Sequence, residues 1–116
     1  MKRIAILGLL LVCIAAATVV FAADKTVSVK GEVVDTFCYA SMGAMGESHA
    51  KCGMGCAAKG IPVGLVEGKK MYILLPAKDA QGLPKTVVEH MGKVVTVTGK
   101  TYEAGGNNFL TVDSVK

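Results

Sequence analysis

Short runs with apolar residues at every second position recur along the chain, and they restrict its fold more than any other feature. The first run, Thr26–Asp35, alternates valines and a glycine with polar residues. Because successive side chains of a strand point to opposite faces, this run predicts a strand with one buried face. Similar apolar or β-branched runs predict four more strands, at Gly64–Glu67, Met71–Leu75, Val94–Gly99 and Phe109–Val115.

Glycine-containing segments separate these runs. Gly68-Lys69-Lys70 predicts a hairpin turn between the second and third strands, and the cluster Gly105-Gly106-Asn107-Asn108 predicts the turn between the last two. Between the third and fourth strands, the segment Asp79–Met91 contains a predicted helix that starts at Pro84 and has Gly92 as its C-cap. Its apolar residues form one stripe: Leu83, Val87, Val88 and Met91. The order is therefore strand, strand, strand, helix, strand, strand.

This order, with an insertion after the first strand, resembles the OB-fold, a five-stranded Greek-key barrel. The resemblance implies a mainly β domain at residues 24–116, with a helical Cys/His insertion at about residues 36–60. A length of 116 residues suits one such domain. Gly31, inside the first strand, predicts a bulge or bend of the kind found where a small barrel curves.

Residues 1–23 are predicted to be an export signal. Two basic residues precede the apolar stretch Ile4–Phe21, and small residues follow it, so we expect cleavage after Ala22 or Ala23. An uncleaved membrane anchor stays open, because the apolar stretch is long enough to cross a bilayer. The protein is thus expected to be periplasmic or secreted, and to contact the membrane only if this segment is retained.

Charge and composition exclude several partners and activities. Removal of Lys2 and Arg3 halves the net charge of +4 and leaves a chain without Arg or Trp. Nucleic acid is therefore not an expected partner, because its binding surfaces need clustered basic residues and stacking aromatics. We see no Ser-His-Asp spacing, no paired acidic residues and no phosphate-binding glycine loop, so no catalytic residue is predicted.

The cysteine count is informative because the predicted compartment is oxidising. Of the four cysteines, Cys13 lies within the predicted signal, which leaves Cys38, Cys52 and Cys56. With an odd number, at least one thiol has no disulfide partner in its own chain. That thiol is unpaired, bound to a metal or bonded to another chain.

Two of these cysteines fall on one face of a predicted helix. The helix spans His49–Lys59, with Ser48 as its N-cap and Gly60 as its C-cap. Its histidine and two cysteines are spaced i, i+3 and i+7, so they lie within an arc of about 60°. One imidazole and two sulfurs therefore share a face.

Together with Cys38, these residues form a C-x10-H-x2-C-x3-C set. Cys38 follows the first strand, and the flexible segment Ala40–Ser48 is expected to bring it back toward the helix. We predict a metal site made of Cys38, His49, Cys52 and Cys56. Thiolate and imidazole ligands suit zinc and Cu(I). Neighbouring methionine thioethers favour copper, whereas the Cys3His count favours zinc.

Alternatives to a metal site stay open. Cys38 could form a disulfide with Cys52 or Cys56, leaving a spare thiol, whereas Cys52 and Cys56 four residues apart on a helix have poor disulfide geometry. Cys52 and Cys56 could instead form the centre of a thiol–disulfide redox protein, the only plausible catalysis. A peptide- or glycan-binding barrel with structural cysteines is a third hypothesis. Asp35 either makes a turn hydrogen bond or orients His49.

The same segment resembles that of a group of small exported bacterial proteins, mostly uncharacterised. Their shared run is V-V-D-x2-C-Y, then H-x2-C-x3-C, then G-x-P-x-G. The matching residues here are Val33, Val34, Asp35, Cys38, Tyr39, His49, Cys52, Cys56, Gly60, Pro62 and Gly64. The resemblance implies a common architecture and carries no assigned activity. Beyond the metal ion, the expected partner is a protein of the cell envelope.

Overall fold

Six strands, three α-helices and one short 3-10 helix make up the part of the chain that the structure, a computed structural model, describes: residues 25–116. In chain order these elements are β1 (Thr26–Asp35), α1 (Thr36–Met42), η1 (Glu47–His49), α2 (Ala50–Ala58), β2 (Val63–Glu67), β3 (Lys70–Pro76), α3 (Lys85–Glu89), β4 (Val94–Ala104), β5 (Asn107–Val112) and β6 (Ser114–Val115). The predicted export signal, its cleavage site and Cys13 lie outside the described residues. Within residues 25–116, no helix has the length and apolarity needed to span a membrane.

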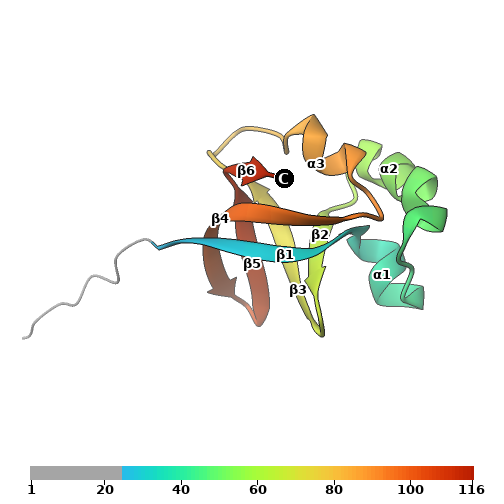
Figure 1. Cartoon of the computed structure of the whole chain (residues 1–116), viewed down its shortest axis with the longest axis horizontal. Helices are drawn as coiled ribbons and strands as arrows, with labels where there is room; N and C mark the ends of the chain where they lie inside the picture. The colour runs from blue at the N-terminus through green and yellow to red at the C-terminus, as the bar shows by residue number, and fades with distance from the viewer. Residues whose placement is uncertain (1–24) are drawn as a thin grey trace, which may run out of the picture.

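The first five strands close into a barrel, as Figure 1 shows. The hydrogen-bonded order is β1-β2-β3-β5-β4, and β4 pairs back onto β1. All of these pairings are antiparallel except β3 with β5, which is parallel. This closed mixed sheet, with helices after β1 and between β3 and β4, confirms the predicted OB-fold-like architecture.

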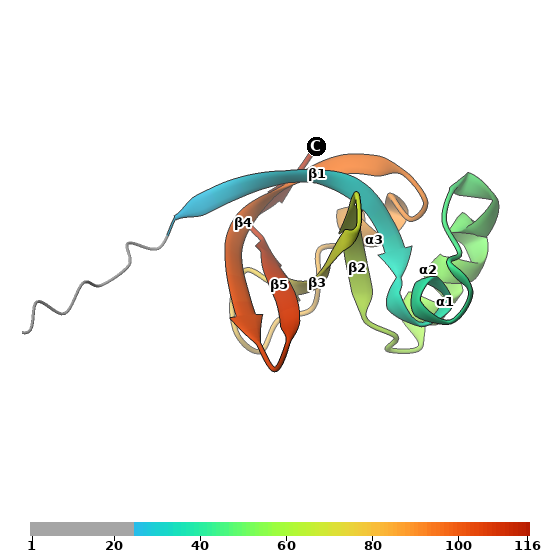
Figure 2. The ribbon, with the colours of Figure 1, turned by 90° about the horizontal axis from the view of Figure 1, so that it is seen from below.

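Strand β1 belongs to two sides of the barrel. Its first residues pair with β4 and its last residues with β2, and Glu32 has a partner in each. Figure 2 shows the resulting curvature of β1 over the barrel. At Gly31, a Cβ atom would lie 2.5 Å from the carbonyl oxygen of Val66, so the bend leaves room only for glycine. The bend predicted at this glycine is therefore present.

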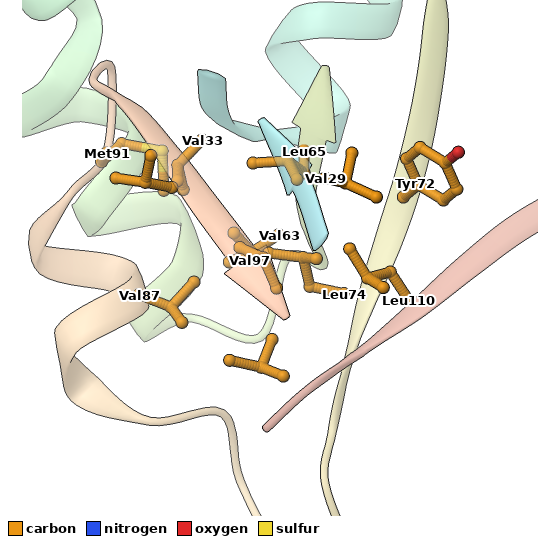
Figure 3. Packing of buried hydrophobic residues seen from close by; sticks show 12 residues of the cluster. Val29, Val33, Val63, Leu65, Tyr72, Leu74, Val87, Met91, Val97 and Leu110 are labelled. Carbon is orange, nitrogen blue, oxygen red and sulfur yellow. The ribbon is translucent and has the colours of Figure 1, made fainter. Parts of the chain in front are cut away.

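Alternating side chains of the strands fill the barrel, and α3 covers its end. Figure 3 shows the buried cluster, in which Val87 and Met91 from the α3 region pack beside valines and leucines from the strands. Its members are Val29, Val33, Val63, Leu65, Tyr72, Leu74, Val87, Met91, Val95, Val97, Leu110 and Val112. The predicted apolar stripe therefore faces the core, although the helix is shorter than expected.

Helix α3 begins at Lys85, directly after Pro84, so the start predicted at this proline is confirmed to within one residue. The predicted boundary at the last hairpin was wrong for a local reason. The last hairpin turn contains only Gly105 and Gly106, both with positive φ, so the predicted turn residues Asn107 and Asn108 already belong to β5. A two-residue turn lets β4 and β5 extend further than their β-branched cores suggested.

Candidate metal site

Asp35 connects the barrel to the inserted helices. It is the last residue of β1 and the N-cap of α1, and its side chain is fully buried. One carboxylate oxygen, Oδ1, accepts a hydrogen bond of 2.9 Å from the backbone N–H of Cys38. This hydrogen bond satisfies one of the backbone donors that the first turn of a helix leaves unpaired.

Helix α1 was not predicted, and its last residues fall within Ala40–Ser48, the segment that was predicted to be flexible. It ends at Gly43, whose φ of 65° is the left-handed conformation typical of a residue that closes a helix. A carboxylate at one end and a glycine at the other therefore define a helix of only seven residues, Thr36–Met42. The helix holds Cys38 in its first turn, directly beside the end of β1.

The thiol of Cys38 is buried against the Asp35 carboxylate. Burial, the hydrogen bond from the thiol to Asp35 and the negative charge of Asp35 together raise its pKa to about 11. In the metal-free protein Cys38 is therefore a protonated thiol at neutral pH. A buried, protonated thiol is a poor nucleophile.

The segment after α1 returns to the barrel and positions the histidine. The backbone N–H of Gly46 donates a hydrogen bond to the Glu32 carboxylate on β1. On its other side, Gly92 lies so close that a Cβ there would be 2.4 Å from the Gly46 carbonyl oxygen. The loop is therefore held between β1 and the end of the α3 region, and η1 begins directly after it.

His49, the last residue of η1, contacts the second oxygen of Asp35. The distance between His49 Nε2 and Asp35 Oδ2 is 2.8 Å, and the histidine side chain is 18% exposed. Because a carboxylate can only accept, Nε2 carries the hydrogen and donates it. One buried carboxylate thus fixes both the helix that carries Cys38 and the imidazole of His49.

The ionisation of Asp35 reflects these partners. Burial raises the pKa of its carboxyl group, but the backbone hydrogen bond from Cys38, the hydrogen bonds from His49 and the Cys38 thiol, and the charge of His49 together lower it below the ordinary value of 3.8. Asp35 is therefore ionised at neutral pH although it is fully buried.

Helix α2 differs from its predicted form at both ends. It begins at Ala50, and His49 lies directly before it as the last residue of η1 and the N-cap residue of α2, so Ser48 is not the cap. At its other end Lys59 is the C-cap and Gly60, with φ of 94°, comes next. The N–H of Ile61 donates to the carbonyl of Cys56, as in a Schellman motif, which turns the chain toward β2.

Cys56 and Cys52 continue the thiol group toward the surface. The Cys56 thiol is partly buried and interacts with the thiol of the buried Cys38 and with that of the exposed Cys52. Burial raises the pKa of Cys56, the negative charge of Asp35 and the neighbouring Cys52 raise it further, and Cys38 lowers it. The three sulfurs therefore form a chain in which Cys56 is central and Cys52 is outermost.

Helix α2 lies close to the barrel because it contains a glycine at the contact. A Cβ on Gly53 would be 2.8 Å from the sulfur of Met91 and 3.4 Å from Asp35 Oδ2. The buried Met91 thioether therefore lies beneath α2, next to the carboxylate. The exposed Met42 lies on α1, whereas Met45 borders a narrow crevice that is also lined by His49 and Met91.

The remaining motif residues hold the insertion to β2. Both the backbone N–H and the hydroxyl of Thr36 donate to the carbonyl of Pro62, at 3.0 and 2.9 Å. Gly64 in β2 leaves space for Met71 and for the methyl group of Thr36, which lie 3.1 and 3.3 Å from the position of a Cβ. These residues therefore have structural roles beside the site.

Among residues 25–116, one compact group could hold a metal ion. Potential ligand atoms of Asp35, Cys38 and His49 all lie within 4.8 Å of one another. Of the four ligands predicted from sequence, the structure thus brings Cys38 and His49 into this group. Cys56 and the exposed Cys52 lie outside this group, although the Cys56 thiol interacts with that of Cys38.

Sequence reasoning gave Asp35 too little weight. Its signal was the spacing D-x2-C after a strand, which places a carboxylate at a helix N-cap and a cysteine at the third helical position. Both interpretations offered for Asp35 are correct at once, since one oxygen makes the local turn bond and the other holds His49. His90, by contrast, donates from Nδ1 to the Thr86 carbonyl of its own helix region and has no link to the site.

No family model matches the chain, and searches of curated proteins and of solved structures returned no match either.

Proposed function

We propose that this protein is an exported metal-binding module that holds one zinc or Cu(I) ion in the helical insertion of its barrel. The observation that carries the proposal is the convergence of Cys38 and His49 on Asp35, within 4.8 Å, with Cys56 in contact with Cys38. A histidine held by a buried carboxylate beside a thiol is the environment in which zinc and copper are commonly bound.

We assign the metal to Cys38, His49, Cys56 and Cys52, with Asp35 behind the histidine. Both Asp35 oxygens already accept hydrogen bonds from the protein. If Asp35 keeps the Nε2 hydrogen of His49, the other ring nitrogen is left for the metal. A carboxylate that orients a ligating histidine in this way is a common feature of zinc sites and makes the imidazole a stronger ligand.

Binding must compete with protons in such a site. The metal-free thiols of Cys38 and Cys56 have raised pKa values and carry their protons at neutral pH. Metal binding therefore releases protons, and the apparent affinity increases with pH. Export is supported by the basic residues and the apolar stretch at the start of the sequence. In an oxidising compartment, free thiols need a ligand if they are not to form disulfides.

Metal titration of the purified, reduced protein tests this proposal. Zn²⁺ in competition with a chromophoric chelator, and Cu(I) in competition with a Cu(I)-specific chelator under anaerobic conditions, should each show uptake of about one ion per chain. The thermal midpoint should rise with the preferred metal and fall again with excess chelator. Absence of stoichiometric uptake, with a midpoint unchanged by chelator, overturns the proposal.

A disulfide between Cys38 and Cys56 is the second candidate, favoured by the interaction between their thiols. It would close a loop between α1 and α2 and contribute about 3 kcal/mol to stability. Cys52 would then remain as an exposed thiol. Intact mass under non-reducing conditions separates the two, because each disulfide removes two hydrogens from the chain.

A further inference from the structure

We infer that Cys52 is the ligand through which the metal is exchanged with a carrier whose own metal ligands are thiolates. This inference rests on the proposed function and deepens it. It divides the ligands into an inner set that retains the ion, Cys38, His49 and Cys56, and one outer ligand that meets the carrier.

Exposure decreases stepwise along the connected side chains. Cys52 is exposed, Cys56 is partly buried, Cys38 is buried and Asp35 is fully buried. Because Cys52 and Cys56 lie four residues apart on α2, and Cys56 also interacts with Cys38, an ion on Cys52 can pass to the inner ligands. An approaching carrier therefore meets the Cys52 sulfur before any other ligand.

The surface of α2 around Cys52 is open. Gly55, between the two helix cysteines, has no atom within 4 Å of the position of a Cβ, and it is exposed. The residues after Cys56 are alanines, and Cys52 itself is exposed. The thiolate of a carrier can therefore come within bonding distance of a metal held there.

The exposed charges near α2 favour the approach of a negatively charged carrier. Lys51 and Lys59 are exposed near the two ends of α2, and the nearby acid Glu47 is in the preceding 3-10 turn. Complexes of Cu(I) with two thiolates, or of Zn²⁺ with three or four, carry net negative charge. Two lysines against one glutamate favour their approach.

The exchange involves no change of oxidation state. A metal–sulfur bond to Cys52 forms and one metal–sulfur bond to the carrier breaks. The proton displaced from Cys52 passes to the released carrier thiolate. Cys56, Cys38 and His49 then replace the remaining carrier ligands in the same way.

Rates and affinities distinguish the outer ligand from the inner ones. Cu(I) is supplied as its glutathione complex in one arm and on a short synthetic peptide with two cysteines in another, and capture is followed by stopped-flow mixing. Cys52→Ser should slow capture at least tenfold in both arms while reducing the equilibrium affinity less than Cys38→Ser does. Cys38→Ser should reduce the affinity about a hundredfold or more and leave initial capture near the wild-type rate.

Controls keep the outcomes separate. Ser48→Ala, an exposed change next to the site, should alter neither rate nor affinity. If Cys38→Ser does not fold, Cys56→Ser takes its place, and wild-type protein alkylated at Cys52 alone supplies a second test of the outer ligand. Capture by Cys52→Ser at the wild-type rate overturns the inference while the proposed metal site stands, whereas no binding by the wild type overturns both.

Discussion

His49 Nε2 lies 2.8 Å from Asp35 Oδ2, while the other oxygen of the same carboxylate caps the helix that carries Cys38. Two segments separated in sequence are therefore fixed by one fully buried group. Because the carboxylate has a hydrogen-bond donor on each oxygen, its burial does not leave an unsatisfied charge. Removal of Asp35 should consequently disturb the insertion more than removal of any single ligand.

Replacement of Asp35 should separate its structural role from its effect on metal binding. Asp35→Ala loses the helix cap and leaves two buried donors unpaired, so we expect a loss of about 2–4 kcal/mol in the free energy of unfolding. Asp35→Asn can still cap the helix, so it should cost less stability but reduce metal affinity by about 10- to 100-fold. Urea unfolding and chelator competition measure the two quantities.

The matched control for this prediction is Asp79→Ala. Asp79 is exposed and its side chain accepts only from the neighbouring N–H of Ala80. Its removal should change stability by no more than about 0.5 kcal/mol. Equal effects of the alanine substitutions at Asp35 and Asp79 would show that the buried carboxylate does not organise the insertion.

Acid should lower the stability of the metal-free protein, because Asp35 becomes protonated. The pKa of this carboxyl group is lowered by folding, so the unfolded chain binds the proton more readily. The stabilising contribution is therefore complete above the ordinary pKa of 3.8 and is lost as the pH falls through the lower folded value. Urea unfolding from about pH 6 down to about pH 2 should show the free energies of unfolding of wild type and Asp35→Asn coming closer together. A difference that stays constant over this range would contradict the prediction.

Alkylation of Cys38 should depend on pH in the alkaline range. Its pKa of about 11 implies that about one molecule in a thousand is the thiolate at about pH 8. Reaction with iodoacetamide, followed by peptide mass spectrometry, should therefore be slow in the folded metal-free protein and should become faster up to about pH 11. Because the raised pKa belongs to the folded state, the associated stability is present below pH 9.0 and is lost as the pH rises through about 11.

A variant at Asp35 identifies what raises the pKa of Cys38. Asp35→Asn removes the negative charge beside Cys38 but leaves the thiol buried, so the alkylation profile should move only part of the way back toward pH 9.0. Denaturant should abolish the difference among Cys38, Cys52 and Cys56. A folded-state profile for Cys38 that matches the denatured one would show that its environment does not protect it.

Strand periodicity made the barrel predictable, whereas the site depended on contacts that no local pattern encodes. The alternation in Thr26–Asp35 gave the bounds of β1 correctly, because burial on one face and exposure on the other leave a period of two. Helix α1 escaped prediction because it has only seven residues and its stability comes from its two caps. The grouping of His49 with Cys38 depends on a loop held by Glu32 and Gly92, which are distant in sequence.

The glycines of α2 offer a matched test of how tightly the helix packs on the barrel. Gly53→Ala would place a methyl group 2.7 Å from the Cγ of the buried Met91. The steric cost should exceed the better helix preference of alanine, for a net loss of about 1–2 kcal/mol. Gly55→Ala meets no atom within 4 Å and should gain about 0.5–1 kcal/mol. Thermal unfolding measures both, and equal stabilisation by the two would mean that α2 is not held against Met91.

Closure of the barrel should depend on a second close approach, between β4 and β5. A Cβ on Gly99 would lie 1.8 Å from the carbonyl oxygen of Thr111, a backbone atom that cannot move without separating the strands. We expect Gly99→Ala to cost at least about 3 kcal/mol. Gly82→Ala, in a loop where a Cβ meets no atom within 4 Å, should change stability by less than about 1 kcal/mol. Urea unfolding of both variants is the measurement, and a Gly99→Ala protein as stable as Gly82→Ala would show that β4 and β5 do not approach this closely at Thr111.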